Sequence, residues 1–251
     1  MKRLSAILLV LLIAGGSLFA GGQAEGDDNV ITVGTDATWP PMEFINEDQE
    51  LVGFDIDLMN AIADAAGFEV EFQNTAWDGI FAGLGSGDYD AVISSVTITE
   101  ERDETMDFSE PYLNAGQVLV VPADGPEGIT DLASEMSGAV IGAQIGTTGA
   151  ILVQDAGLEL RTYDEIGLAI EDLANGRIDG VVADTPIAAD YALQNENYAE
   201  TLKIGSEPFT EELYGIAVNE GNDEVLSMIN EGLEIVRENG TIEDLQDKWL
   251  R

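Results

Sequence analysis

After residue 29, short runs of β-branched and apolar residues alternate with segments in which apolar residues recur at helical spacing. Residues 30–35 alternate and are β-branched, which predicts a strand. A helix is then predicted to run to Ala66 and to end at Gly67. The same order recurs with a strand at 68–72, a helix at 79–86 and a strand at 91–95. This repeat is typical of a parallel sheet with crossover helices.

A second series of the same kind begins after the turn-forming residues 124–128, Asp-Gly-Pro-Glu-Gly, which mark a domain boundary. Its predicted strands are 139–143, 161–163, 180–183 and 202–204, and its longest predicted helix is 165–175. The closing elements are a strand at 214–218, an amphipathic helix at 223–239 and a last helix through Trp249. These elements would cover the first sheet, so we expect an α/β fold with two lobes and two chain crossings between them.

Arg102 is the only basic side chain between residues 4 and 160. Thr99 and the two acids after it predict a helix N-terminus. Arg102 then takes the third helical position, where a capping box would hold Glu or Gln and where the helix dipole disfavours a cation. A carboxylate bound at this helix end would explain the arginine, because backbone N–H groups and a guanidinium both suit it. The alternative is a weak surface pair with a neighbouring acid.

Polar and aromatic side chains follow the predicted strands, at the edge where open α/β sheets place ligands. Asp36 and Trp39 follow the first strand and Trp77 the second, and the two indoles could flank a side chain between them. Asp36 could instead cap a turn, and Trp39 could cover the core. The third strand leads to Ser94, Ser95 and Thr97.

In the second series, residues 144–149 form a Gly/Thr loop that opens a helix. It is not a phosphate-binding P-loop, because no Lys follows the glycines and their spacing differs. The free N–H groups of this helix could hold a carboxylate. Asp184 could bind an ammonium group or act only as a helix cap.

The composition excludes several classes of site. The chain has no Cys and no His, which removes disulfides, thiol catalysis and the commonest metal ligands. Asp55 and Asp57 could suggest a metal site, but they open a helix, where acids are usually capping groups, so we expect them to be structural. We therefore expect no bound metal and no cofactor. The net charge of −40 repels nucleic acid and attracts cations, although a salty habitat or solubility would also explain it.

Lys2 and Arg3 precede an apolar run and a series of small residues, which predicts a cleavable signal peptide at residues 1–24 and export to the periplasm. No Cys follows Ala20, so a lipid anchor is not expected. A retained N-terminal anchor is the alternative.

Several motifs resemble one family in order and spacing: residues 34–41 (GTDATWPP), 53–58 (GFDIDL), 97–102 (TITEER), 146–149 (GTTG), 183–186 (ADTP) and 237–241 (RENGT). They are similar to the periplasmic polar amino-acid-binding proteins of ABC importers, solute-binding protein family 3. The resemblance implies a type II periplasmic binding fold, in which two lobes with mainly parallel sheets close about two hinge strands. It implies that residues 25–115 and 211–251 form lobe 1 and residues 116–210 form lobe 2, with hinge strands near 113–118 and 207–213.

The resemblance also implies a ligand site. Arg102, with N–H groups of Thr97 and Thr148, would hold the α-carboxylate. Asp184 and the Ser95 carbonyl would hold the α-ammonium. Trp39 and Trp77 would enclose the ligand side chain, and the polar tip of that side chain would lie near Asp36 and Gln144. The implied set is Asp36, Trp39, Trp77, Ser94, Ser95, Val96, Thr97, Arg102, Gln144, Thr147, Thr148 and Asp184.

The ligand is predicted from two departures. Ala183 stands where a glutamine binder of this family has a histidine, and Gln144 stands where it has a lysine. Both departures argue against glutamine, and the loss of the lysine while Asp36 is kept between two indoles favours a ligand side chain with a cationic tip. Arginine or another basic amino acid is therefore expected, bound by a monomer that delivers it to the importer's membrane subunits. The alternatives are a binder of glutamine or another polar amino acid, an enzyme resembling the cyclohexadienyl dehydratases, and a sensor domain on the same fold.

Overall fold

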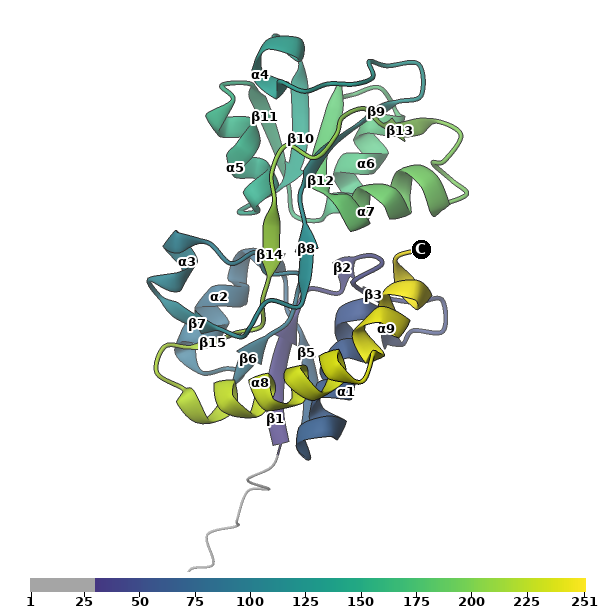
Figure 1. Cartoon of the computed structure of the whole chain (residues 1–251). Helices are drawn as coiled ribbons and strands as arrows, with labels where there is room; N and C mark the ends of the chain where they lie inside the picture. Colours follow the sequence, from purple (N-terminus) through teal and green to yellow (C-terminus); the bar gives the residue numbers. More distant parts are fainter. Residues whose placement is uncertain (1–29) are drawn as a thin grey trace, which may run out of the picture.

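The computed structural model of the protein describes residues 30–251, which build two lobes joined by a pair of strands (Figure 1). Each lobe surrounds its own five-stranded sheet. The predicted signal peptide, residues 1–24, lies outside the described residues. Within residues 30–251, no helix combines the length and apolarity needed to cross a membrane.

The sheet of the first lobe has the strand order β5-β1-β6-β15-β7. Its strands are β1 (Val30–Thr35), β5 (Glu69–Asn74), β6 (Ala91–Val92), β7 (Met106–Phe108) and β15 (Ala217–Asn219). β5 and β6 are parallel to β1, and β15 is antiparallel to both β6 and β7. Four of the five strands therefore run in the same direction, and β15 is the strand that the chain contributes on its return from the second lobe.

Helices α1 (Phe54–Ala66) and α2 (Trp77–Ser86) connect the strands of the first lobe, and α8 (Asp223–Glu238) and α9 (Thr241–Trp249) cover it after the chain returns. The short α3 (Glu100–Asp103) precedes β7. As predicted, α1 ends at Gly67, which adopts the left-handed conformation with φ 80°. Helix α8 packs closely on α1 at Gly232, where a Cβ would lie only 2.3 Å from the Ile62 carbonyl oxygen.

The second sheet has the order β11-β10-β12-β9-β13. Its strands are β9 (Gln117–Pro122), β10 (Val140–Gln144), β11 (Glu159–Tyr163), β12 (Gly180–Asp184) and β13 (Leu202–Ile204). Here β9 is the strand of opposite direction. The helices of this lobe are α4 (Leu132–Glu135), α5 (Thr148–Asp155), α6 (Ile166–Ala174), α7 (Thr185–Ala189) and the π-helical turn η1 (Asp190–Gln194).

The two crossing segments form an antiparallel ribbon of β8 (Leu113–Ala115) and β14 (Glu212–Tyr214). The single strand predicted at 214–218 is wrong, because β14 ends at Tyr214 and β15 begins at Ala217. Between them the chain passes from the ribbon into the sheet of the first lobe. The close packing there suits a glycine, since a Cβ at Gly215 would lie 2.9 Å from the Ile98 side chain.

A small antiparallel sheet follows β1, in a part of the chain where the sequence analysis predicted no strand. It consists of β2 (Thr38–Trp39), β3 (Glu43–Ile45) and β4 (Leu51–Val52). The Pro40–Pro41 peptide bond is cis and lies just beyond β2, so the prolines leave the pairing of β2 with β3 intact. This sheet carries Trp39 to the edge of the lobe.

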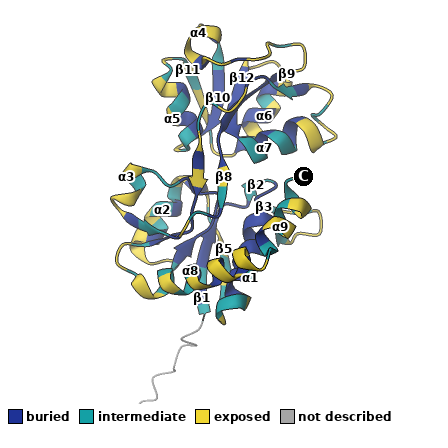
Figure 2. Cartoon of the chain, viewed as in Figure 1, coloured by how far each residue is buried: buried dark blue, intermediate teal, exposed yellow. Residues whose placement is uncertain are grey.

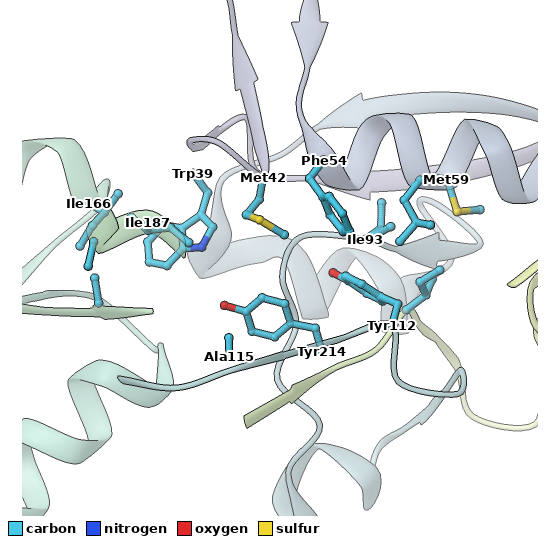
Figure 3. Packing of buried hydrophobic residues seen from close by; sticks show 14 of the residues in the cluster. Trp39, Met42, Phe54, Met59, Ile93, Tyr112, Ala115, Ile166, Ile187 and Tyr214 are labelled. Carbon is cyan, nitrogen blue, oxygen red and sulfur yellow. The ribbon is translucent and has the colours of Figure 1, made fainter. Parts of the chain in front are cut away.

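The buried core runs from one lobe into the other. Figure 2 shows the central strands β9, β10 and β12 of the second sheet as largely buried and the outer faces of the helices as exposed. One cluster of buried residues joins Trp39 of the first lobe to Ile166 and Ile187 of the second. Figure 3 shows these three side chains together, with Tyr214 of the ribbon nearby. The lobes are therefore in contact, and the structure is a closed arrangement.

Candidate ligand-binding site

A cavity lies between the lobes, on the side of the sheets where the strands end. Side chains of both lobes line it: Asp36, Trp39, Glu43, Trp77, Ser94, Ser95, Thr97, Arg102, Gln144, Thr147, Thr148 and Asp184. All the predicted site residues are in this set except Val96. The side chain of Val96 is instead fully buried in a cluster with Ile80 and Trp77, behind the cavity wall. Glu43 is the lining residue that the sequence analysis missed.

Arg102 reaches the cavity from the start of α3. As predicted, Thr99 caps this helix, and its hydroxyl accepts a hydrogen bond from the Arg102 N–H at 3.2 Å. The guanidinium donates to the Thr97 carbonyl at 2.8 Å and, across the lobes, to the Gly146 carbonyl at 3.5 Å. It lies 5.4 Å from the centre of the Trp77 ring.

The guanidinium of Arg102 has no carboxylate within 4.0 Å among residues 30–251, so the alternative of a surface pair with a neighbouring acid is wrong. Burial lowers the pKa of Arg102, while the charges of Asp184 and Glu212 act in the opposite direction. The arginine is thus a half-buried cation without a directly paired anion. Such a group gains strongly from an anionic ligand.

Asp184 ends β12 and forms the acidic side of the cavity. Its carboxylate accepts hydrogen bonds from the Tyr214 hydroxyl and the Gln117 side-chain amide. Burial raises the pKa of Asp184 to about 6, and the nearby Arg102 opposes that rise. Asp184 also begins α7, but its side chain makes no capping hydrogen bond there. The alternative in which it serves only as a helix cap is therefore wrong.

Asp36 joins the two lobes at a second point of the cavity. Its carboxylate accepts from the Thr38 hydroxyl at 2.9 Å within its own turn, and from the Gln144 amide of the other lobe at 2.9 Å. Its backbone N–H donates to the Ser94 hydroxyl at 3.0 Å. Burial raises the pKa of Asp36. Asp36 therefore does contact its own turn, through Thr38, as the alternative interpretation expected. Its second carboxylate oxygen, however, faces Gln144 of the opposite lobe.

The two tryptophans that line the cavity are both nearly buried, with 7% of Trp39 and 8% of Trp77 exposed. Trp39 packs in the core cluster that continues into the second lobe. The Trp77 ring packs edge-on against Phe81 at 5.0 Å, and its indole N–H end lies beside Gly146 of the second lobe. Each indole thus helps to close the cavity at the contact between the lobes.

Glu43 is fully buried on β3, beside Asp55 at the start of α1. The Glu43 carboxyl accepts from the Ser94 hydroxyl at 2.8 Å. The Asp55 carboxylate accepts from the Ser95 N–H at 2.7 Å and the Tyr112 hydroxyl at 2.9 Å. Burial, and then the charge of Asp55, raise the pKa of Glu43 well above its usual range, and burial raises that of Asp55 to about 6. Asp55 is therefore structural, as predicted, and it supports the serines that line the cavity.

Thr147 and Thr148 begin α5 on the opposite wall. Thr147 is the N-cap, and its hydroxyl accepts from the Ala150 N–H at 3.2 Å. The Thr148 hydroxyl instead donates to Glu212 of the hinge ribbon at 2.7 Å. Within residues 30–251, no group of three or more side chains of metal-ligand type is arranged to hold a metal ion. The chemistry of the cavity is thus that of one cation, several carboxyl groups and two indoles.

Comparison with known proteins places the chain in a family. Residues 31–251 match the family model of bacterial extracellular solute-binding proteins, family 3. A probable histidine-binding protein of Neisseria gonorrhoeae is 35% identical over 92% of this chain and 87% of its own length. The ABC transporter arginine-binding protein 1 of Escherichia coli is 36% identical over 88% of this chain and 90% of its own.

Solved structures of similar proteins have the same fold. An ancestral arginine-binding protein bound to arginine is 42% identical, with a TM-score of 0.81 over 89% of this chain and 99% of that one. The same kind of ancestral protein bound to glutamine is 43% identical, with a TM-score of 0.81 over 88% of this chain and 97% of that one. The fold is the type II periplasmic binding protein fold that the resemblance implied. The chain belongs to the bacterial extracellular solute-binding proteins of family 3.

Proposed function

We propose that the protein captures an L-amino acid in the cavity between its lobes, prefers arginine or another basic amino acid, and delivers it to the membrane subunits of an ABC importer. The observation that carries this proposal is the charge of the cavity lining. Arg102 is its one cation, whereas Asp36 and Asp184 are acidic.

The charged groups of the cavity complement those of a bound amino acid. Arg102 lacks a paired carboxylate and suits the α-carboxylate of the ligand. Asp184 lies near Arg102 and suits the α-ammonium. Asp36 then remains as a buried carboxylate held only by neutral donors, Thr38 and Gln144. A cationic side chain would supply the charge that Asp36 lacks, and the indoles would enclose its apolar stem.

The second candidate ligand is glutamine or another polar amino acid. It is favoured by the similar ancestral protein that was solved with glutamine bound. In that case the contacts of Asp36 with Thr38 and Gln144 would be sufficient for the carboxylate, and a neutral amide at the ligand tip would bind beside them.

We propose further that the protein is not an enzyme. The curated relatives are named as binding proteins, and a structure that is 33% identical is an ancestral amino-acid-binding protein described as a precursor of cyclohexadienyl dehydratase. The carboxyl groups that line the cavity, Asp36, Glu43 and Asp184, each accept a hydrogen bond from a neighbouring donor, which suits binding better than proton transfer.

The remaining parts of the proposal concern the whole chain. We propose that residues 1–24 are a cleaved signal peptide, that no lipid anchor is attached, and that the mature protein is a periplasmic monomer that does not bind nucleic acid. We also propose lobe boundaries at 25–115 with 211–251, and at 116–210. The positions of β8 and β14 support these boundaries.

Calorimetry on refolded, ligand-free protein against the twenty amino acids and ornithine tests the function. Heat with arginine, lysine or ornithine alone supports the basic-ligand proposal. Heat with glutamine or another neutral amino acid refutes that specificity but keeps the amino-acid class. Absence of heat across the panel refutes the class, and turnover of prephenate or arogenate by the same sample would identify an enzyme instead.

A further inference from the structure

Glu212 is a buried carboxylate on the hinge ribbon, with 8% of the residue exposed. It begins β14 and lies opposite Ala115 of β8, where the chain crosses between the lobes. It does not line the ligand cavity but stands behind it. A carboxylate in such a place is costly unless several donors reach it.

Three hydroxyl groups donate to Glu212. One comes from the first lobe, Thr97 at 2.8 Å, and one from the second, Thr148 at 2.7 Å, and both reach the same oxygen, Oε2. The third is Thr210 of the hinge segment, which donates to Oε1 at 2.9 Å. The side-chain amide of Gln117 adds a longer contact at 3.4 Å. A single carboxylate oxygen thus links the two lobes.

This link depends on closure. Thr97 follows the first sheet and Thr148 begins α5 of the second lobe, so a hinge movement that separates the lobes changes the distance between the two hydroxyls. Glu212 would then lose one of its donors, and a buried carboxylate that loses a charge-assisted hydrogen bond is destabilised. The contact therefore favours the closed arrangement over the open one.

Thr97 also connects Glu212 to the ligand cavity. Its carbonyl oxygen accepts from the Arg102 guanidinium at 2.8 Å, while its hydroxyl donates to Glu212. The hydroxyl protons of Thr97 and Thr148 are both directed to Glu212. The charges of Glu212 and Asp184 both favour the protonated Arg102.

We propose that Glu212 is a positioning residue that holds the lobes closed by accepting the hydroxyl groups of Thr97 and Thr148, and so slows ligand release. The inference deepens the proposed function and rests on it for the ligand, but not for the closure itself.

The test compares Glu212→Ala with Glu211→Ala, because Glu211 is the exposed neighbour and the change removes the same charge. The chain has no Cys, so Glu104→Cys and Asp155→Cys place one fluorescent label on an exposed position of each lobe. The label distance is measured without and with arginine, and arginine dissociation is measured by stopped flow.

We expect Glu212→Ala to raise the dissociation rate about 10-fold or more, with a much smaller change in the association rate, and to lengthen the mean label distance. Glu212→Gln keeps an acceptor and should restore part of the loss, whereas Glu211→Ala should match the parent protein. An unchanged label distance together with a dissociation rate within about 2-fold of the parent would overturn the proposal.

If Glu212→Ala does not fold, Thr148→Val replaces it, because this variant removes the hydroxyl that the second lobe donates to Glu212. The distance between the two labels should lengthen in Thr148→Val. An unchanged distance would again overturn the proposal. The two proposals fail separately. If no amino acid binds, the proposed function is refuted, and the label distance without ligand still decides the role of Glu212.

Discussion

Replacing Glu43 with glutamine should make the protein more stable at neutral and alkaline pH. Glu43 Oε2 and Asp55 Oδ1 are buried and accept no hydrogen bond from an N–H or O–H group of residues 30–251. A proton on Glu43 resolves this, because the protonated carboxyl can donate to Asp55, and burial raises the pKa of Glu43 well above its usual range. In Glu43→Gln, the amide N–H₂ takes the place of this proton, and the amide oxygen can still accept from Ser94.

The magnitude follows from proton linkage. The unfolded chain releases the Glu43 proton near pH 4.5, whereas the folded protein keeps it. Above that pH the folded state binds one more proton, so the parent protein loses about 1.4 kcal/mol of stability per pH unit from this group. The loss continues until the folded-state pKa is reached, and below pH 4.5 it vanishes. Glutamine does not titrate, so above pH 4.5 the free-energy difference between variant and parent should grow by up to about 1.4 kcal/mol per pH unit, until the folded-state pKa of Glu43 is reached.

Urea unfolding of both proteins at pH 5, 6, 7 and 8 measures this difference directly. Buried acids that do not contact Glu43, such as Asp184, lower the stability of parent and variant alike as pH rises, so their effects cancel in the comparison. Glu71→Gln is the matched control, because Glu71 lies on the exposed face of β5 and undergoes the same chemical change. A difference between Glu43→Gln and the parent that stays constant from pH 5 to 8 would show that Glu43 is ionised in the folded protein, and would refute the reasoning.

Two further substitutions test the site and the fold. Arg102→Ala should weaken binding of any α-amino acid by about 100-fold or more in calorimetry, because the ligand carboxylate loses its half-buried cation, while the exposed Arg161→Ala should leave it unchanged; equal affinity of both variants would refute the carboxylate role. Gly53→Ala should destabilise the protein by about 2–4 kcal/mol in urea unfolding, because φ is 138° and the new Cβ would lie 2.1 Å from the Met42 carbonyl oxygen. Gly67→Ala, with φ 80° and open space, should cost only about 1 kcal/mol, and a larger loss there than at Gly53 would contradict the packing argument.

The two βα series could be predicted because their strands and helices are long enough to show a period. The candidate cavity followed from the same pattern, since the strand ends bring Asp36, Ser94, Gln144 and Asp184 to the edges that face each other. The small β2–β4 sheet could not be predicted, because its strands have two or three residues and show no period. The split between β14 and β15 depends on the crossing between the lobes, which local sequence does not encode.

Glu43 and Glu212 escaped prediction for another reason. They are two of 49 acidic residues, and nothing in their neighbours distinguishes them from solvated ones. What makes them special is burial with partners far away in the chain, such as Thr97, which lies 115 positions before Glu212. The local pattern even points the other way for Glu43, because an alternating strand would bury its apolar neighbours Met42 and Phe44 and leave the glutamate exposed, whereas Glu43 is the buried residue of β3.

The most direct test of the account is the preference for arginine over glutamine in the parent protein and in Asp36→Asn, measured by calorimetry. Asparagine keeps the size of the side chain and an oxygen that can accept from the Gln144 amide, and the Thr38 hydroxyl can accept from the new N–H₂ group. The account predicts that arginine binding weakens by about 2 kcal/mol or more while glutamine binding changes little. An equal loss for both ligands, or an unchanged affinity for arginine, would contradict the claim that Asp36 selects a cationic side chain.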